Sequence, residues 1–325
     1  KNIDIMLISE NCMKINKGKV QNTIIDYSIS NVGPSARSKV LFEYAKQEGH
    51  NIFAKVQINN SWECSAVPYI PVFNLIKRHI DNLKNLNIDG LMLSWTLGGY
   101  PGGGLEYISN SYGSDNFNED NWYKDTFGND YIDIKKAVTL FSKAFESFPF
   151  DIDFLYNGPQ NMGSGNLWYA EDTGLKSTMV GFPYDDINGW KGVYSKEILT
   201  KQLKKLSEKW KKGIDILNNI KTGNEKTFEI KTIANACYAH FNSSYLLCEY
   251  ILKREELNKT KDKKIRKELI DIIEKEKNNT LTLYKAQSQN SCIGFEASNH
   301  YYYNENTLLE KIVNLNNLKD YYLEQ

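Results

Sequence analysis

NIFAKVQINNSWECSAVPYIPVFNLIKRHIDNLKNLNIDGLMLSWTLGGYP, residues 51–101, is the stretch that decides the fold. It opens with an apolar run at residues 52–58, whose β-branched side chains predict a buried strand. Two prolines then precede apolar residues at helical spacing, and a second apolar run at residues 88–94 predicts another strand. The order strand, loop, helix and strand is that of a right-handed parallel β-α-β unit.

The same alternation extends toward the N-terminus. Residues 3–9 predict a strand, and residues 36–48 predict a helix that Gly49 caps. The first 100 residues therefore follow the order β-α-β-α-β. Three strands are too few to close a barrel, which needs eight. The sequence predicts either the last three units of a (β/α)₈ barrel of the TIM type or one half of a smaller α/β sheet.

The character of the chain changes after this part. Residues 100–130 are rich in Gly, Asn, Ser and Asp and predict a long loop. A helix is expected at residues 132–148, and aromatic Gly/Asn-rich loops follow it. From residue 195 the pattern predicts an α-helical region, with helices at residues 195–217, 228–256, 263–286 and 306–318. We expect a β/α barrel-type part (1–130), a cleft wall (131–194) and an α-helical C-terminal domain (195–325).

Charge and cysteine content exclude several classes of function. The 40 basic and 40 acidic residues balance, so no global field favours nucleic acid or an anionic membrane. Five scattered cysteines form no metal motif, the histidines lack HxH or HExxH spacing, and no cofactor motif is present. We therefore expect no metal and no cofactor, and structural roles for His50, His79 and His240.

The N-terminus enters a strand without a leader, and the sequence has no apolar run of membrane-spanning length. These features predict a cytoplasmic protein that starts partway through a fold. An N-terminal segment or a second chain would then complete the barrel.

Polar and aromatic side chains follow the predicted strands, where parallel α/β folds carry their chemistry. Glu10 follows the first strand, and Glu63 follows the second. Two carboxyl groups on one rim are what glycoside hydrolysis requires. Around them, candidate sugar-binding residues are Gln57, Asn60, Trp62, Trp95 and Tyr100.

Several phrases carry a resemblance to a known class of protein. ISE (8–10), AKVQINNSWE (54–63), VPYIPV (67–72) and LSWTLGGYP (93–101) resemble the later strands of bacterial (β/α)₈-barrel glycoside hydrolases. NGPQNMGSGNLWY (157–169), VGFPYDDINGW (180–190) and GFEASNHYYY (294–303) are similar to the C-terminal half of large carbohydrate-active bacterial proteins. The family pattern places an acid/base carboxylate on the fourth strand, which this chain would lack.

These phrases extend the list of candidate substrate-binding residues. From the C-terminal blocks we add Asn161, Asn166, Trp168, Tyr169, Asp185, Asp186, Glu296, Asn299 and His300. The leading interpretation is a glycosidase, or its C-terminal part, in which Glu63 and Glu10 supply the acid and the base or nucleophile. Two alternatives stay open: a carbohydrate-binding protein without catalysis, and a helical interaction module.

Overall fold

A computed structural model describes most of the chain. The described residues are 3–59, 61–94, 102–114, 116–178, 181, 183–221, 223–296 and 300–324. The strands are β1 (Ile5–Ile8), β2 (Lys14–Lys17), β3 (Val20–Thr23), β4 (Ile52–Val56), β5 (Gly90–Leu93), β6 (Phe295–Glu296) and β7 (His300–Tyr301). The α-helices are α1 (Ala36–Gln47), α2 (Phe73–Lys84), α3 (Gly103–Tyr112), α4 (Glu119–Phe127), α5 (Tyr131–Phe145), α6 (Ile152–Asn157), α7 (Ile187–Trp190), α8 (Lys196–Asn219), α9 (Glu225–Thr260), α10 (Lys263–Gln289) and α11 (Glu305–Glu324).

The N-terminal part contains the predicted parallel strands, and they form one sheet in the order β1-β4-β5. Residue 5 pairs with residue 52, and residue 53 pairs with residue 90, both in parallel register. The prediction of a barrel remnant is wrong. Within the described residues β1 and β5 are the outer strands of a three-stranded sheet, and the chain after β5 forms mainly helices, so no strand closes a ring.

One face of this sheet is buried, and the other is partly exposed to solvent. Because side chains alternate along a strand, Ala54 and Val56 lie on one face, where they are fully buried and where α1 packs. On the other face Met6 and Met92 expose 49% and 42% of their surface. Parallel sheets are usually covered on both faces. The expected completing segment or second chain stays a prediction.

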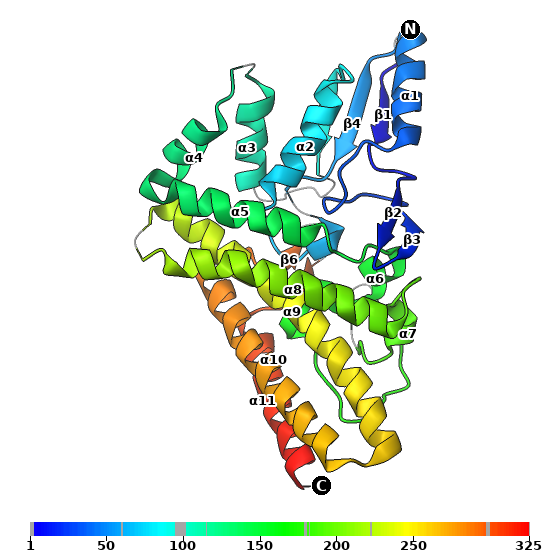
Figure 1. Cartoon of the computed structure of the whole chain (residues 1–325), viewed down its shortest axis with the longest axis vertical. Coiled ribbons are helices and arrows are strands. Elements are labelled where there is room, and N and C mark those ends of the chain that lie inside the picture. The colour runs from blue at the N-terminus through cyan, green and yellow to red at the C-terminus, as the bar shows by residue number, and fades with distance from the viewer. Residues whose placement is uncertain are drawn as a thin grey trace.

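The C-terminal half is helical, as the sequence predicts (Figure 1). Helix α5 packs against both α2 and α8, so it connects the α/β part to the helices. Consecutive helices then pack in pairs, α8 with α9, α9 with α10, and α10 with α11. Helix α9 carries buried residues around most of its circumference, because it lies among α8, α10 and the loops that precede α7.

Part of the predicted loop at residues 100–130 is helical. It contains α3 and α4, which pack a cluster of aromatic rings together. Tyr107 lies at the centre, with its ring centroid 4.9 Å from that of Trp122 and 5.7 Å from that of Phe117. Burial of these rings outweighs the weak helix propensity of the Gly and Asn residues around them.

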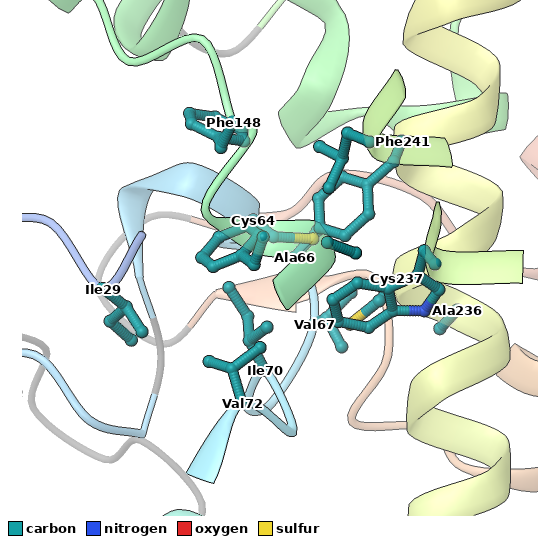
Figure 2. Packing of buried hydrophobic residues seen from close by; sticks show 14 of the residues in the cluster. Ile29, Cys64, Ala66, Val67, Ile70, Val72, Phe148, Ala236, Cys237 and Phe241 are labelled. Carbon is teal, nitrogen blue, oxygen red and sulfur yellow. The ribbon is translucent and has the colours of Figure 1, made fainter. Parts of the chain in front are cut away.

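The segment after β4 joins the two halves of the molecule. It begins with the short 3₁₀ helix η1 (Trp62–Cys64) and runs through buried residues to Val72. Figure 2 shows Cys64, Ala66 and Val67 lying near Cys237 and Phe241 of α9. The segment thus starts from the sheet, at the end of β4, and packs against α9.

Within the described residues, no helix combines the length and the apolar character needed to cross a bilayer.

The contact between α5 and α8 gives a stability prediction. A methyl group at Gly213 would lie 2.4 Å from Cε1 of Phe141, whose ring stacks on Trp210 at 4.4 Å. Overpacking of this kind costs about 1–3 kcal/mol, which we expect to outweigh the gain in helix propensity of ~1 kcal/mol. Gly213→Ala should therefore lower the free energy of unfolding in urea, whereas the exposed neighbour change Lys212→Ala should leave it within about 0.5 kcal/mol. A stabilised Gly213→Ala protein would contradict this packing.

Candidate active site

The parallel sheet brings two carboxyl groups to one edge. Glu10 follows β1 by two residues, and Glu63 lies in η1 after β4. Because β1 and β4 are adjacent and parallel, their carboxyl ends meet. Both side chains are fully buried, and the charge of Glu63 acts on Glu10.

Glu63 is surrounded by hydrogen-bond donors. Its carboxylate accepts from the hydroxyls of Ser28 (2.8 Å), Ser30 (2.5 Å) and Ser61 (3.0 Å). The backbone N–H groups of Ile29 (2.7 Å) and Ser30 (3.2 Å) also donate to it. Burial raises the pKa of Glu63, and the donors from Ser30, Ile29 and Ser28 oppose that rise. Five donors occupy the oxygens, so Glu63 clamps the loop 28–30 to η1.

Glu10 has the opposite environment. Neither of its oxygens has a hydrogen-bond partner within the part of the chain that the structure describes. Burial raises the pKa of Glu10 well above its usual value, and the negative charges of Glu63 and Asp26 raise it further. The backbone amides of Glu10 and Ser28 act against this rise without cancelling it. A buried carboxyl group with this environment favours its protonated form.

His79 of α2 is the third ionisable group at this edge. Its Nε2 lies 2.7 Å from the Ser9 hydroxyl, and its Nδ1 lies 3.4 Å from Oε1 of Glu10. Burial lowers the pKa of His79 to about 3, so the ring is neutral at physiological pH. His79 is therefore a polar neighbour of Glu10 and does not balance its charge.

Other predicted residues lie on the same segment. Gln57 is buried, and its amide atoms have no hydrogen bond to any described residue. Asn59 is held at its backbone N–H by the Ser94 hydroxyl at 3.1 Å. Trp62 is only 8% exposed, and its ring lies 4.8 Å from that of Tyr156. Such burial fits a wall of the site better than an open platform for a sugar ring.

The two predicted aromatics of the C-terminal block lie elsewhere. Trp168 is buried with its ring stacked on Tyr250 of α9 at 4.8 Å, and Nζ of Lys311 lies 4.4 Å from the ring centroid. The carbonyl of Tyr169 accepts from the hydroxyl of Tyr250 and from Arg254. Both residues therefore pack the loop against the helices, and none of these contacts involves Glu10.

The predicted amides have internal partners. Asn161 accepts from Ser65 at 2.8 Å and donates to the Leu155 carbonyl. Asn166 donates to the Gly163 carbonyl, and its own carbonyl accepts from Lys311. These bonds hold the loops between α6 and α7 in place.

The adjacent acids also serve local structure. Asp185 accepts from the backbone N–H of Thr173 at 2.7 Å and lies 3.8 Å from Arg254. Asp186 is the N-cap of α7 and accepts from the Asn188 N–H. The structure does not bring either acid to the sheet edge through any contact among the described residues.

The last candidates are only partly described. Glu296 is buried in β6, which pairs with β7. Asn60, Trp95, Tyr100 and Asn299 lie outside the described residues, and His300 is described only as a backbone member of β7.

Sequence reasoning missed three parts of the site. It identifies neither the serine donors Ser28 and Ser30 nor the carboxyl group of Asp26, and it expects a structural role for His79. One signal was present: His79 falls on the same helical face as Ile76, Ile80 and Leu83, where an ionisable side chain must be buried. Among the described residues no cluster of His, Cys, Asp and Glu could hold a metal ion.

Comparisons with known proteins give little further information. No family model matches the sequence, and no curated protein matches it. Among solved structures, the chain is similar to a GH138 enzyme targeting pectin rhamnogalacturonan II, at 11% identity and a TM-score of 0.45. The alignment covers 88% of this chain and 55% of that one, so this chain spans about half of the neighbour's length. A likeness at this level establishes neither a shared fold nor a shared activity.

The contrast between the two carboxyl groups predicts a large loss of stability on substituting Glu63 and a small change on substituting Glu10. Glu63→Gln turns an NH₂ group toward donors that need an acceptor, and each donor left unsatisfied costs about 1–3 kcal/mol. Glu10→Gln removes no hydrogen bond to a described residue, so below pH 4.5, where Glu10 is protonated in the folded and the unfolded chain, its free energy of unfolding should change by at most about 1 kcal/mol. Urea denaturation of the two variants measures the difference. Equal losses would show that Glu63 does not clamp the loop.

The raised pKa of Glu10 also predicts a pH dependence. Above the ordinary value of 4.5 the unfolded chain loses this proton while the folded protein keeps it. The contribution to stability is therefore full at low pH and is lost as the pH rises from about 4.5 toward the folded pKa, at up to about 1.4 kcal/mol per pH unit. Unfolding of wild type and Glu10→Gln at a series of pH values should show this slope only in wild type. Parallel curves would contradict it.

Proposed function

We propose that this chain carries the acid site of a glycan-acting protein, and that Glu10 is its proton donor. The observation that carries the proposal is a fully buried carboxyl group with a raised pKa at the carboxyl end of a parallel strand, beside a second carboxyl group. Glycosidases need one carboxyl group that stays protonated near neutral pH to protonate the leaving oxygen.

Glu63 supports this role through its charge. Its five donors favour a carboxylate that stays in one position and keeps the proton on Glu10 by repulsion. The nucleophile or base that completes hydrolysis needs free lone pairs, which Glu63 lacks in this conformation. Substrate access to Glu10 also requires a local movement of the chain, because Glu10 is fully buried.

Binding without hydrolysis is the second candidate, and the saturation of Glu63 favours it. A site with a single free carboxyl group can hold a sugar hydroxyl by a hydrogen bond, yet it cannot complete a two-carboxylate mechanism. Trp62 and the amide of Gln57, which has no hydrogen bond to any described residue, would then contribute contacts to the sugar.

The test is hydrolysis of a panel of aryl glycosides by wild type and by Glu10→Gln. We expect turnover by wild type and a loss of about 10²–10⁴-fold in kcat in the variant, because general acid catalysis contributes that much. Asp186→Asn, at the N-cap of α7, is the matched control and should retain turnover. Wild-type binding of glycans without turnover would select the second candidate, and equal activity of Glu10→Gln would overturn the assignment of the acid.

A further inference from the structure

Three side chains at the end of β1 form a continuous chain of polar contacts. Ser9 and Glu10 are neighbours in sequence, and the His79 ring lies between their side chains. Nε2 is 2.7 Å from Ser9 Oγ, and Nδ1 is 3.4 Å from Glu10 Oε1. All three residues are at least 97% buried. Each ring nitrogen thus has its own neighbour. The ring proton can lie on Nε2, toward Ser9, or on Nδ1, toward Glu10.

The ring is held in this position by the chain around it. A methyl group at Gly33 would lie 2.5 Å from Nε2 and 3.0 Å from Ser9 Oγ, so the Gly33 backbone packs directly against the Ser9–His79 pair. Asn82, also on α2, donates to the Gly33 carbonyl at 2.8 Å. The same helix therefore places the ring and fixes the backbone that covers it.

A neutral imidazole has one donor nitrogen and one acceptor nitrogen. If Glu10 is protonated, its O–H can donate to Nδ1, and Nε2–H donates to Ser9 Oγ. If Glu10 is ionised, Nδ1–H faces the carboxylate, and the Ser9 hydroxyl donates to Nε2. The ring keeps a single proton in both arrangements, and they differ by the one proton that Glu10 gives to an acceptor.

We propose that His79 is the positioning residue of Glu10: Nδ1 accepts a hydrogen bond from the Glu10 O–H, and the single ring proton moves from Nε2 to Nδ1 when Glu10 loses its proton to an acceptor. The inference rests on the proposed function only where it treats Glu10 as the acid. The 3.4 Å contact is longer than a typical hydrogen bond, and catalytic hydrogen bonds often shorten only when substrate is bound.

The charges around Glu10 favour the protonated arrangement. Glu63 on η1 and Asp26 in the loop after β3 both act on it with negative charge. Lys55 of β4 partly offsets Asp26, and Lys17 of β2 faces Glu63. His79, on α2, stays neutral. Its Nδ1 is therefore available as an acceptor whenever Nε2 carries the ring proton.

The experiment is a pH titration of the ¹⁵N-histidine-labelled protein by NMR, which distinguishes a protonated ring nitrogen from an unprotonated one. The chain has only four histidines, and one is a matched internal control. His240 is also buried, with Nδ1 2.6 Å from the Gln160 carbonyl and Nε2 2.5 Å from the Tyr303 hydroxyl. A carbonyl can only accept, so His240 should keep its proton on Nδ1 throughout.

We expect His79 to carry its proton on Nε2 at low pH and on Nδ1 once Glu10 ionises. In Glu10→Gln, whose NH₂ group donates to Nδ1, the proton should stay on Nε2 at every pH. Ser9→Ala should weaken the preference for Nε2–H and give a mixture of tautomers. The His79 signal is assigned as the one that is absent in His79→Gln.

Three outcomes would overturn the inference: a His79 proton on Nδ1 at all pH values, a switch that persists in Glu10→Gln, or a titration to the imidazolium above pH 5. An unchanged tautomer in Ser9→Ala would show that Ser9 does not influence the position of the ring proton. The NMR measurement needs no substrate. An absence of glycan turnover therefore rejects only the proposed function. A fixed tautomer rejects only the proposed tautomer change of His79.

Discussion

The carboxylate of Glu63 with its five donors is the interaction on which the site depends. Three of these donors come from hydroxyls and two from the backbone of residues 29 and 30. The loop that follows β3 is thereby tied to the segment that follows β4. Removing an acceptor from buried donors is costly, since the donors cannot turn to water. The clamp therefore fixes the position of loop 28–30 and that of a negative charge that acts on Glu10.

Glu10 and Glu63 illustrate how different surroundings can separate the protonation of two chemically identical groups. Both are fully buried, and burial raises the pKa of each. Glu63 is stabilised as an anion by donors, whereas Glu10 meets negative charges and a neutral ring. The proton is consequently easier to keep on Glu10. Burial is the main cause of the raised pKa of Glu10, and the charge of Glu63, which is fixed by its donors, adds to it.

Local patterns in the sequence correctly predicted most helices and strands, but they wrongly predicted that the strands belong to a barrel. The strands β1, β4 and β5 and the helices α1, α2, α5 and α8 to α11 all lie where periodicity places them. Helices α3 and α4 were missed, because buried aromatic rings such as Tyr107 outweigh a Gly/Asn-rich composition. Whether strands close a barrel depends on contacts between distant segments, and a β-α-β pattern carries no information on them.

The residues of the site likewise fall into those that local sequence could identify and those that depend on distant contacts. Glu10 and Glu63 could be predicted because strand ends are recognisable in sequence, but Trp168 and Asp185 could not be excluded. Their partners, Tyr250 and Thr173, come from other segments. His79 shows the remaining limit: a histidine on an apolar helix face is usually structural. It becomes chemically relevant here only because α2 packs where β1 ends and places the ring between Ser9 and Glu10. Packing thus turns a core histidine into a partner of the acid.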